Sequence, residues 1–546
     1  MKDFIPKDFQ APFSEQDFII EGNQQPGEDS IELDVLFIGA GPASLTGAIH
    51  LAQLAKSKKQ NIEIGIMEKA DEVGGHTLSG AVINPLVFKW LFPDKADKDF
   101  PFRKKVKKES FYLLSEQKTF PLPVPPGMKA KGCWTASLCE VARFLAKSAQ
   151  ELGVNIFTSF PAEKLLMNEG KVVGAISKAY GLNKDGTKTD NAEPASKIFA
   201  KVVVLSEGSR GHLTQAYLQN QNITSHYPQT YALGVKEIWE VKKEPDNIFH
   251  SIAWPLDSKT FGGSWFYPLG EGLVSLGLVV GLDYPSAQLS IHDKFQKMKD
   301  HFLFKKYLEG GKCIEWGAKT IPEGGYHAIP NRLSGDGVLI IGDSAGFVNM
   351  ASLKGIHYAM ASGYYSAETI MSAFDKKDFS HSSLKEYDQK IKNSFIAKDL
   401  YIYRNLRQSF HKGLFSGLIK AGLITLTRGY LPFDFKKSQL QEDSKIKRQV
   451  NSSHFSENER MSKVNAVYLS GNKTRDKIPS HLIQKAGIKK DIALFYEKMC
   501  PAGVYEQKGD QLIVNAPNCI DCKATDILGP RWTPRERGSG PNYKIM

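Results

Sequence analysis

The stretch LDVLFIGAGPAS (residues 33–44) decides the fold, because it joins a buried strand to a helix through closely spaced glycines. The apolar run ends at Gly39, and a helix rich in Ala and Leu is predicted to begin at Pro42. Gly39 permits a tight turn, while Gly41 lets the backbone approach a pyrophosphate that the helix N-terminus stabilises. Ser44 replaces the third glycine of the fingerprint. The stretch predicts a dinucleotide site in a parallel α/β fold, with an ordinary glycine-rich turn as the alternative.

A second strand is predicted at residues 62–67, and Glu68 follows it directly. The Glu68 carboxylate is placed to accept hydrogen bonds from a ribose. It comes later than usual in the motif because the helix and a lysine-rich turn at residues 56–59 are long. The residues predicted to contact the cofactor here are Gly39, Ala40, Gly41, Pro42, Ala43, Ser44 and Glu68.

A distant second motif, VLIIGDSAGF (residues 338–347), favours FAD over NAD. It is a buried strand that ends in Gly-Asp and leads into a loop of small residues and a helix. An aspartate here can bond a ribitol hydroxyl, and the helix start can stabilise negative charge on a reduced flavin. A plain helix N-cap is the alternative for this aspartate. The predicted contacts are Gly342, Asp343, Gly346 and Gly355.

Composition limits the remaining possibilities. The 546 residues predict two to three folding units, and a hydrophobic content of 41% excludes global disorder. Residues 225–285 alternate apolar and polar positions with many glycines, which predicts an antiparallel sheet inserted in the α/β frame. The net charge of +12 favours an acidic partner or an anionic membrane surface, and no nucleic-acid-binding signature accompanies it. The sequence contains no stretch of 18 uninterrupted apolar residues, so a membrane-spanning helix is not predicted.

Three of the six cysteines lie at or beyond position 500, which points to a metal site at the end of the chain. They are Cys500, in CPAGVYE (residues 500–506), and Cys519 and Cys522, in NCIDCKATD (residues 518–526). Together with the tail GSGPNY (residues 538–543), these segments resemble the iron–sulfur module of electron-transfer flavoprotein:ubiquinone oxidoreductases.

Further motifs are similar to the same family. VGGHTLSG (residues 73–80) resembles its loop after the second strand, and TFGGSWFY (residues 260–267) resembles its quinone-pocket strand. GLDY (residues 281–284) and EGGK (residues 309–312) fit the same region. The resemblance runs in order from about residue 32 to the end of the chain.

The resemblance implies a mixed α/β fold: an FAD-binding Rossmann-like domain interleaved with an antiparallel-sheet quinone-binding domain, then a C-terminal ferredoxin-like domain. It also implies that Gly75 and His76 lie near the flavin, and that Gly262 and Gly263 give backbone hydrogen bonds to a quinone carbonyl. A strand whose two glycines admit a close neighbour is the alternative for the last pair. The expected boundaries are 1–31 for an N-terminal arm; 32–110, 136–215 and 330–400 for the FAD domain; 111–135 and 216–329 for the quinone domain, with a membrane-contact hairpin; 401–465 for a membrane-surface helix and linker; and 466–546 for the ferredoxin-like domain.

The cysteine module departs from the family pattern at one position. A [4Fe–4S] cluster normally takes four thiolates, and the fourth position here is Thr525. Three outcomes compete. A three-iron cluster sits on three thiolates, a four-iron cluster uses Thr525, Asp526 or solvent at the fourth iron, or the module holds no cluster and is stabilised by packing alone. Three retained cysteines favour a cluster, because free thiols carry an oxidation risk.

The implied function is transfer of electrons from reduced electron-transfer flavoprotein, through FAD and an iron–sulfur cluster, to ubiquinone or menaquinone. No catalytic side chain is predicted, since the cofactors carry the chemistry. A flavin monooxygenase or geranylgeranyl-reductase-like enzyme shares the FAD motifs and is the second hypothesis. A non-catalytic, FAD-binding membrane scaffold is the third.

A membrane-surface helix is expected at residues 412–431. Apolar residues recur there at helical spacing from Leu414 to Tyr430, and Lys412, Lys420 and Arg428 interrupt them, with Lys436 and Lys437 beyond. A core helix is the alternative. The expected location is the inner face of a bacterial cytoplasmic membrane, or the matrix side of the mitochondrial inner membrane if the source is eukaryotic.

Overall fold

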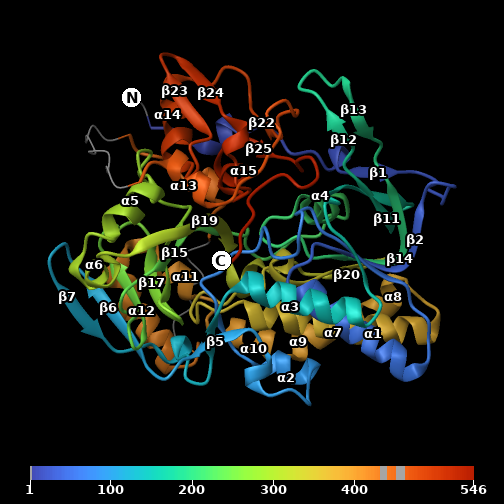
Figure 1. Cartoon of the computed structure of the whole chain (residues 1–546), viewed down its shortest axis with the longest axis horizontal. Helices are drawn as coiled ribbons and strands as arrows, with labels where there is room; N and C mark the ends of the chain where they lie inside the picture. The colour runs from blue at the N-terminus through green and yellow to red at the C-terminus, as the bar shows by residue number, and fades with distance from the viewer. Residues whose placement is uncertain (1–2, 431–439, 451–460) are drawn as a thin grey trace.

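The computed structural model describes residues 3–430, 440–450 and 461–546. Figure 1 shows an antiparallel sheet on the left, a Rossmann-like part on the right and the C-terminal segment across the top. The mixed α/β architecture predicted from the sequence is confirmed.

The first sheet carries the parallel frame. Its strands run in the order β1-β10-β11-β14-β2-β3-β9. Strand β21 pairs with the last three residues of β14 and also with β20. Strands β14, β2, β3, β9 and β21 are parallel, since each is joined to the next along the chain by a connection much longer than a hairpin turn. Their bounds are β1 (Ile19–Glu21), β2 (Ile31–Ile38), β3 (Ile64–Met67), β9 (Asn155–Phe157), β10 (Ala162–Asn168), β11 (Lys171–Ser177), β14 (Lys197–Leu205), β20 (Ser334–Gly335) and β21 (Val338–Ile340).

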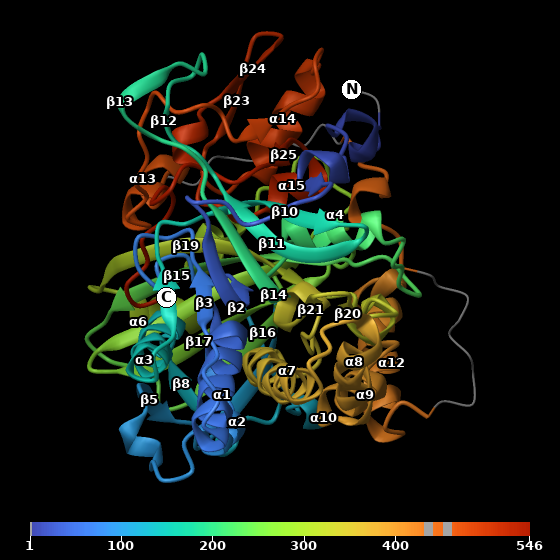
Figure 2. The same cartoon turned by 90° about the vertical axis from the view of Figure 1, so that its right-hand side faces the viewer.

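Helices α1 (Pro42–Lys58) and α7 (Ile356–Lys376) lie side by side below this sheet (Figure 2). Two glycines permit their close approach. A Cβ atom on Gly363 would lie 2.0 Å from the Ala43 carbonyl oxygen, and one on Gly47 would lie 3.1 Å from the Gly363 carbonyl oxygen. Helix α3 (Leu138–Glu151) packs against α1, and α2 (Leu86–Leu91), α8 (His381–Leu384), α9 (Glu386–Asn393) and α10 (Phe395–Ile402) complete this layer.

The second sheet has the strand order β19-β15-β18-β17-β16-β6-β7, and only the β16–β6 pair is parallel. Its last two strands come from a hairpin far earlier in the chain. Helices α5 (Ile291–Met298) and α6 (Phe302–Leu308) precede β19. The strands are β6 (Glu109–Leu114), β7 (Thr119–Leu122), β15 (Tyr231–Glu240), β16 (Ile248–Ala253), β17 (Gly262–Gly270), β18 (Leu273–Gly281) and β19 (Lys312–Pro322). Smaller pairings join β4 (Val82–Ile83) and β5 (Phe102–Lys105) to β8 (Trp134–Ala136), and β12 (Tyr180–Leu182) to β13 (Lys188–Glu193).

The C-terminal module is built from short elements whose apolar residues share one core with the antiparallel sheet. The hairpin β23–β24 and the antiparallel pair β22–β25, which joins distant segments of the module, accompany three helices. The elements are α13 (Lys463–Leu469), β22 (Leu482–Ile483), α14 (Lys490–Met499), β23 (Tyr505–Lys508), β24 (Gln511–Val514), α15 (Ala524–Leu528) and β25 (Arg531–Trp532).

Two segments differ from their sequence predictions. The N-terminal arm is more than a polar extension, since β1 pairs with β10 and Phe18 and Ile19 are buried in the main core. The expected helix at residues 412–431 is shorter: α12 spans Leu414–Leu426 after α11 (Leu406–Ser409), because Arg428 adopts a left-handed conformation. Lys436 and Lys437 lie outside the described residues. Of the helices within the described ranges, none combines the length and apolar character that crossing a membrane requires.

Candidate functional site

The first glycine turn has the geometry that a pyrophosphate needs. Gly39 has φ 98°, and a Cβ atom on it would lie 2.9 Å from the Ser206 carbonyl oxygen, so no other residue fits without strain. Gly41 is the N-cap residue of α1, and a Cβ atom there would meet no atom within 4 Å. The open space lies at the start of α1, where backbone N–H groups are free. The site therefore fits an anionic dinucleotide.

Ser44 and Glu68 support this turn in different ways. Ser44 is fully buried, and its hydroxyl bonds that of Ser206 at the end of β14, so the side chain does not face the open space. The Glu68 carboxylate accepts the Ala40 N–H at 2.8 Å and the Ala70 N–H at 2.9 Å. Glu68 therefore lies beside the glycine turn, as expected, and also fixes the turn.

The second motif meets the first in space. A Cβ atom on Gly342, which has φ 61°, would lie 3.1 Å from the Ala43 Cβ atom at the start of α1. Burial raises the pKa of Asp343 to about 6, and Lys319 opposes this change. Gly355 is the N-cap residue of α7. Two motifs 300 residues apart thus converge on one region, which is the arrangement that FAD binding requires.

The loop after β3 connects this region to the C-terminal module. The Gly75 carbonyl accepts the Tyr543 N–H at 2.9 Å. The buried His76 Nδ1 lies 3.9 Å from the Asp521 carboxylate, and desolvation holds the pKa of His76 well below its usual value. Lys69 Nζ binds the same carboxylate at 2.7 Å. His76, predicted as a flavin neighbour, therefore lies between the FAD frame and the cysteine loop.

Three thiols gather in that module. Cys500, Cys519 and Cys522 are buried, and none forms a disulfide. Burial raises the pKa of Cys519 to about 12, and burial with the two neighbouring thiols raises that of Cys522 strongly. Bound iron would supply the positive charge that the thiolates lack, so this donor set fits an iron–sulfur cluster. Asp521 and Lys523 have φ values of 54° and 69°, and these left-handed conformations turn the loop sharply beside Cys519 and Cys522.

The candidates for the fourth position differ in their contacts. Thr525 is buried in the first turn of α15. The Asp526 carboxylate is already engaged: one oxygen accepts Arg210 Nε at 2.6 Å, and the other accepts Arg531 at 3.3 Å and the Trp532 N–H at 3.1 Å. Asp526 therefore serves as a bridge between the module and Arg210, which follows β14.

Sequence reasoning missed the ion cluster around Asp521. This fully buried carboxylate binds Lys69, Arg535 Nε at 3.1 Å and Trp532 Nε1 at 3.1 Å. Opposing burial, Arg535 and Lys69 hold the pKa of Asp521 well below its usual range. The available signal was an acid inside the Cys-x-x-Cys loop, which needs a cation once the loop is buried.

The strand assigned to the quinone pocket is tightly packed. Gly262 begins β17, and a Cβ atom on it would lie 2.3 Å from the Val279 carbonyl oxygen on β18. A Cβ atom on Gly263 would lie 2.8 Å from the Ser251 carbonyl oxygen on β16. Close strand neighbours alone require both glycines, so their role toward a quinone stays a prediction.

Comparisons with known proteins decide the family. A family model described as "ETF-QO, ubiquinone-binding" matches residues 231–321, and one described as "Electron transfer flavoprotein-ubiquinone oxidoreductase, 4Fe-4S" matches residues 458–544. The human mitochondrial electron transfer flavoprotein-ubiquinone oxidoreductase is 35% identical over 94% of this chain and 89% of its own length. The rice and Arabidopsis thaliana proteins of that name are 35% and 36% identical, covering 95% of this chain each and 94% and 85% of their own lengths. This chain belongs to the electron transfer flavoprotein-ubiquinone oxidoreductase family.

Solved structures show how widely the flavoprotein frame of this family is shared. A geranylgeranyl bacteriochlorophyll reductase-like protein from Thermoplasma acidophilum aligns with a TM-score of 0.55 at 19% identity, covering 73% of this chain and 97% of its own. The flavin-dependent brominase Bmp2 aligns with a TM-score of 0.51 at 18% identity, over 75% of this chain and 96% of its own. Identities this low show a common fold alone. The reductase-like and monooxygenase hypotheses therefore share the frame, whereas the family match favours the oxidoreductase.

Helix α12 presents apolar side chains to solvent. Phe415, Ile419 and Leu426 are 65%, 70% and 82% exposed, while Leu414 and Ile424 are buried. A core helix would bury the whole stripe, so the exposure favours a helix whose apolar face lies against a membrane surface. Phe120, on β7 of the early hairpin, is 47% exposed.

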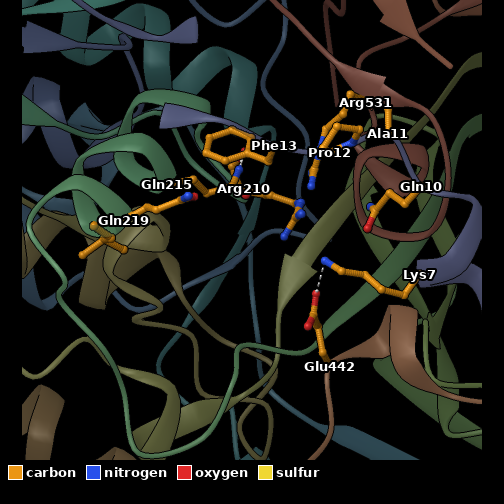
Figure 3. Close-up of a pocket in the computed structure, with 11 residues that line it drawn as sticks. Lys7, Gln10, Ala11, Pro12, Phe13, Arg210, Gln215, Gln219, Glu442 and Arg531 are labelled. Atoms are coloured by element: carbon orange, nitrogen blue, oxygen red, sulfur yellow. Dashed lines mark hydrogen bonds and ion pairs between the residues drawn. The ribbon is translucent and has the colours of Figure 1, made fainter. Parts of the chain in front are cut away.

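A surface pocket of about 380 Å³ lies where the N-terminal arm, α4 (His212–Asn220) and the C-terminal module meet (Figure 3). Lys7 and Glu442 form an ion pair of 3.3 Å at its side. Arg210 and Arg531 also line the pocket, and both are paired with Asp526. Its cations are therefore neutralised within the protein, and the pocket is separate from the glycine turns.

Proposed function

We propose that this chain is an oxidoreductase that passes electrons from reduced electron-transfer flavoprotein, through FAD and an iron–sulfur cluster, to ubiquinone. One observation carries the proposal: the dinucleotide frame and the buried three-thiol site touch directly, through Lys69 and His76 on one side and Asp521 on the other. Contact between the segments that would hold the two cofactors brings them near each other, and short separation favours electron transfer. The names of the relatives supply the donor and the acceptor.

The residues of this chain would hold FAD through the backbone. The start of α1 at Gly41 would bind the pyrophosphate, Glu68 would accept a ribose hydroxyl, and Asp343 would face the ribitol. When bound, the flavin exchanges electrons with both partners. Gly346 and Gly355 shape the loop and helix start beside it. No side chain acts as nucleophile or general base in this scheme.

The cluster would rest on Cys500, Cys519 and Cys522. Because Arg210 and Arg531 hold the Asp526 carboxylate, the fourth position is left to Thr525 or solvent, or is vacant in a three-iron cluster. Tyr505 is fully buried near the three thiols, and burial, with the neighbouring cysteines adding to it, raises the pKa of its hydroxyl well above its usual value. A cluster with a non-thiolate corner differs in potential from an all-thiolate one.

The domain boundaries given above remain part of the proposal, and pairing of β6 and β7 with β16 supports assigning the early hairpin to the quinone domain. Ubiquinone, or menaquinone in its place, would bind at the Gly262–Gly263 strand. The relatives are named as mitochondrial, which supports a mitochondrial location if the source is eukaryotic, and the exposed apolar stripe of α12 supports a membrane-surface location. The finer location is the matrix side of the inner membrane, or the inner face of a bacterial cytoplasmic membrane.

The membrane contact has its own test. Replacing Phe415, Ile419 and Leu426 by Asp removes the exposed apolar stripe of α12, so the protein is expected to leave anionic vesicles in a flotation assay. Tyr468→Asp, at an 85% exposed position on α13, is the matched control and should stay bound. Aggregation of the triple variant would show instead that the stripe packs inside the protein.

The function is tested on anaerobically reduced, purified protein. Absorbance reports flavin and electron paramagnetic resonance reports the cluster. Addition of a short-chain ubiquinone should then reoxidise both, and reduced electron-transfer flavoprotein should reduce them again. Flavin that is reduced by NAD(P)H and reoxidised only by oxygen would support the monooxygenase hypothesis instead.

A further inference from the structure

A buried set of charged side chains lies beside the Gly262–Gly263 strand and has no part in the scheme above. It contains Asp283, which follows β18, Glu323, which follows β19, and Arg407, on α11. Arg407 Nη2 donates to Asp283 Oδ1 at 2.6 Å, and its Nε lies 3.5 Å from Glu323 Oε2. Asp443 and Arg448 complete the set: Arg448 donates to the Asp443 carbonyl at 3.1 Å.

This set touches the quinone strand on one side. The Arg407 guanidinium lies over the Phe261 ring, 4.2 Å from its centroid, and Phe261 directly precedes Gly262. A Cβ atom on Gly281 would lie 2.7 Å from Arg407 Nη2, and the Gly281 N–H donates to the Phe261 carbonyl at 2.9 Å. The charged groups are therefore next to the strand on which a quinone would bind.

The set approaches the flavin loop on its other side. Gly324, adjacent to Glu323, donates its N–H to Gln229 Oε1 at 2.6 Å. The Gln229 amide in turn contacts the loop after Asp343, since a Cβ atom on Gly346 would lie 2.7 Å from Gln229 Nε2. Glu323 is thus linked through Arg407 to the strand of Gly262, and through Gly324 and Gln229 to the loop after Asp343.

Charge counting shows that the set holds a proton. Three carboxyl groups face two guanidinium groups, and Arg448 and Asp443 are almost completely buried. An uncompensated buried negative charge is costly, so one carboxyl group is kept neutral. Burial raises the pKa of Asp443 well above its usual range, so Asp443 holds that proton firmly, and Glu323 is the group that exchanges a proton near neutral pH. The groups that face Glu323 are Arg407 and Asp283; those that face Asp443 are Asp283, Arg407 and Arg448, and Arg448 also faces Tyr284. Burial raises the pKa of Glu323 to about 7. The charge of Arg407 opposes this increase, and that of Asp283 adds to it.

Several polar atoms in and beside the set still have free hydrogen-bonding capacity. Within residues 3–430, 440–450 and 461–546, no hydrogen bond reaches Glu323 Oε2 or Asp443 Oδ1 of the set, or either amide atom of Gln408, which follows Arg407 on α11. Buried polar atoms of this kind are ordinarily satisfied by water or by a ligand. Asp283, whose side chain is 23% exposed, connects the set to solvent.

We propose that Glu323 delivers the protons for quinol formation at the Gly262–Gly263 strand, that Arg407 positions it, and that Asp283 returns protons to it from solvent. The inference rests on the proposed function. Reduction of a quinone to a quinol consumes two electrons, which the flavin supplies, and two protons. For each proton, the Glu323 O–H bond breaks and an O–H bond forms on a quinone oxygen. The carboxylate then regains a proton through Asp283 before the second transfer.

The test follows flavin reoxidation in a stopped-flow instrument after anaerobic reduction of the holoenzyme. A short-chain ubiquinone needs protons, whereas ferricyanide accepts single electrons and needs none. With ubiquinone, the wild-type rate should fall as the pH rises through about 7, because Glu323 loses its proton. Glu323→Gln should be about tenfold slower or more at acidic pH and lose this pH dependence, yet react normally with ferricyanide.

Two variants and the wild type make the outcome unambiguous. Glu244→Gln is the matched control, since Glu244 accepts the Gly270 and Gly272 N–H groups at the far end of the same β17–β18 hairpin. Glu323→Asp keeps a carboxyl group and should retain the pH dependence. Equal quinone rates in Glu323→Gln and wild type, equal slowing with both oxidants, or a wild-type rate independent of pH would each overturn the inference alone. Wild-type protein that ferricyanide oxidises and ubiquinone does not would overturn the proposed function as well.

Discussion

The dinucleotide site and the cysteine module are in contact, and each departs from its expected motif at one residue. The two departures have opposite consequences. At the dinucleotide site, Ser44 replaces a glycine, and its hydroxyl forms a hydrogen bond with the hydroxyl of Ser206. In the module, Thr525 replaces a thiolate, and the chemistry of a whole cluster corner changes. The first site is built from backbone N–H groups and conformation, which many side chains leave intact. The second is built from side-chain ligands, each of which counts.

The sharpest way to break this comparison is to fill the backbone site. Gly41→Val is expected to reduce bound FAD by about tenfold or more, because its side chain occupies the space of the pyrophosphate. Gly41 has φ −84° and no atom near its Cβ position, so the variant should fold and keep its iron. Flavin and iron content of the purified protein measure both effects.

Gly27→Val is the matched control for Gly41→Val, since its Cβ position is equally open and lies in the N-terminal segment before β2. It should retain its full complement of FAD. If Gly41→Val also keeps all its flavin, the pyrophosphate lies elsewhere.

The complementary change restores the side-chain site. Thr525→Cys supplies a fourth thiolate and should yield a cluster that is silent to electron paramagnetic resonance when oxidised and visible when reduced. A wild-type three-iron cluster would show the reverse behaviour, with a signal in the oxidised state. A four-iron cluster with Thr525 or solvent at its corner would differ from the variant in potential.

Two further variants frame that measurement. Tyr468→Cys adds a thiol to the same module at an 85% exposed position on α13 and should leave the spectrum unchanged. Cys519→Ser should lose most of the iron while keeping FAD. Wild-type protein that takes up no iron during anaerobic reconstitution would leave the module a packing unit.

The smallest expected effect concerns the bridge that holds the two regions together. Asp526→Asn leaves Arg210 and Arg531 without a counter-charge, which costs about 3 kcal/mol of stability for a buried pair. Against the effect of burial, the two arginines lower the pKa of Asp526 to about 2, from 3.8. Its contribution is therefore complete above pH 3.8 and is lost as the pH falls toward 2.

Thermal unfolding of both proteins at neutral and acidic pH measures this contribution. The wild type should lose stability relative to Asp526→Asn as the pH falls through that window. Asp510→Asn, at the exposed turn between β23 and β24, serves as the control. Equal stability of Asp526→Asn and wild type at neutral pH would show that the bridge contributes nothing net.

Much of the fold followed from local patterns. The glycine turn after β2, the Gly-Asp motif after β21 and the antiparallel strands were predicted because each pattern reflects short-range backbone geometry. Burial of the N-terminal arm was missed, since its pairing with β10 joins residues more than a hundred positions apart. The position of His76 beside Asp521 was missed for the same reason.

The sequence by itself determined the dinucleotide turn, the three cysteines and the missing fourth thiolate, because these depend on residue type and near spacing. Only the tertiary structure decided that Asp526 is bound to Arg210, that the α12 stripe faces solvent, and that Glu323 joins Asp283 and Arg407 beside Gly262. A carboxylate is a potential ligand, ion-pair partner or proton donor in any sequence. Which of these it becomes depends on burial and on charges that the fold brings to it from distant segments.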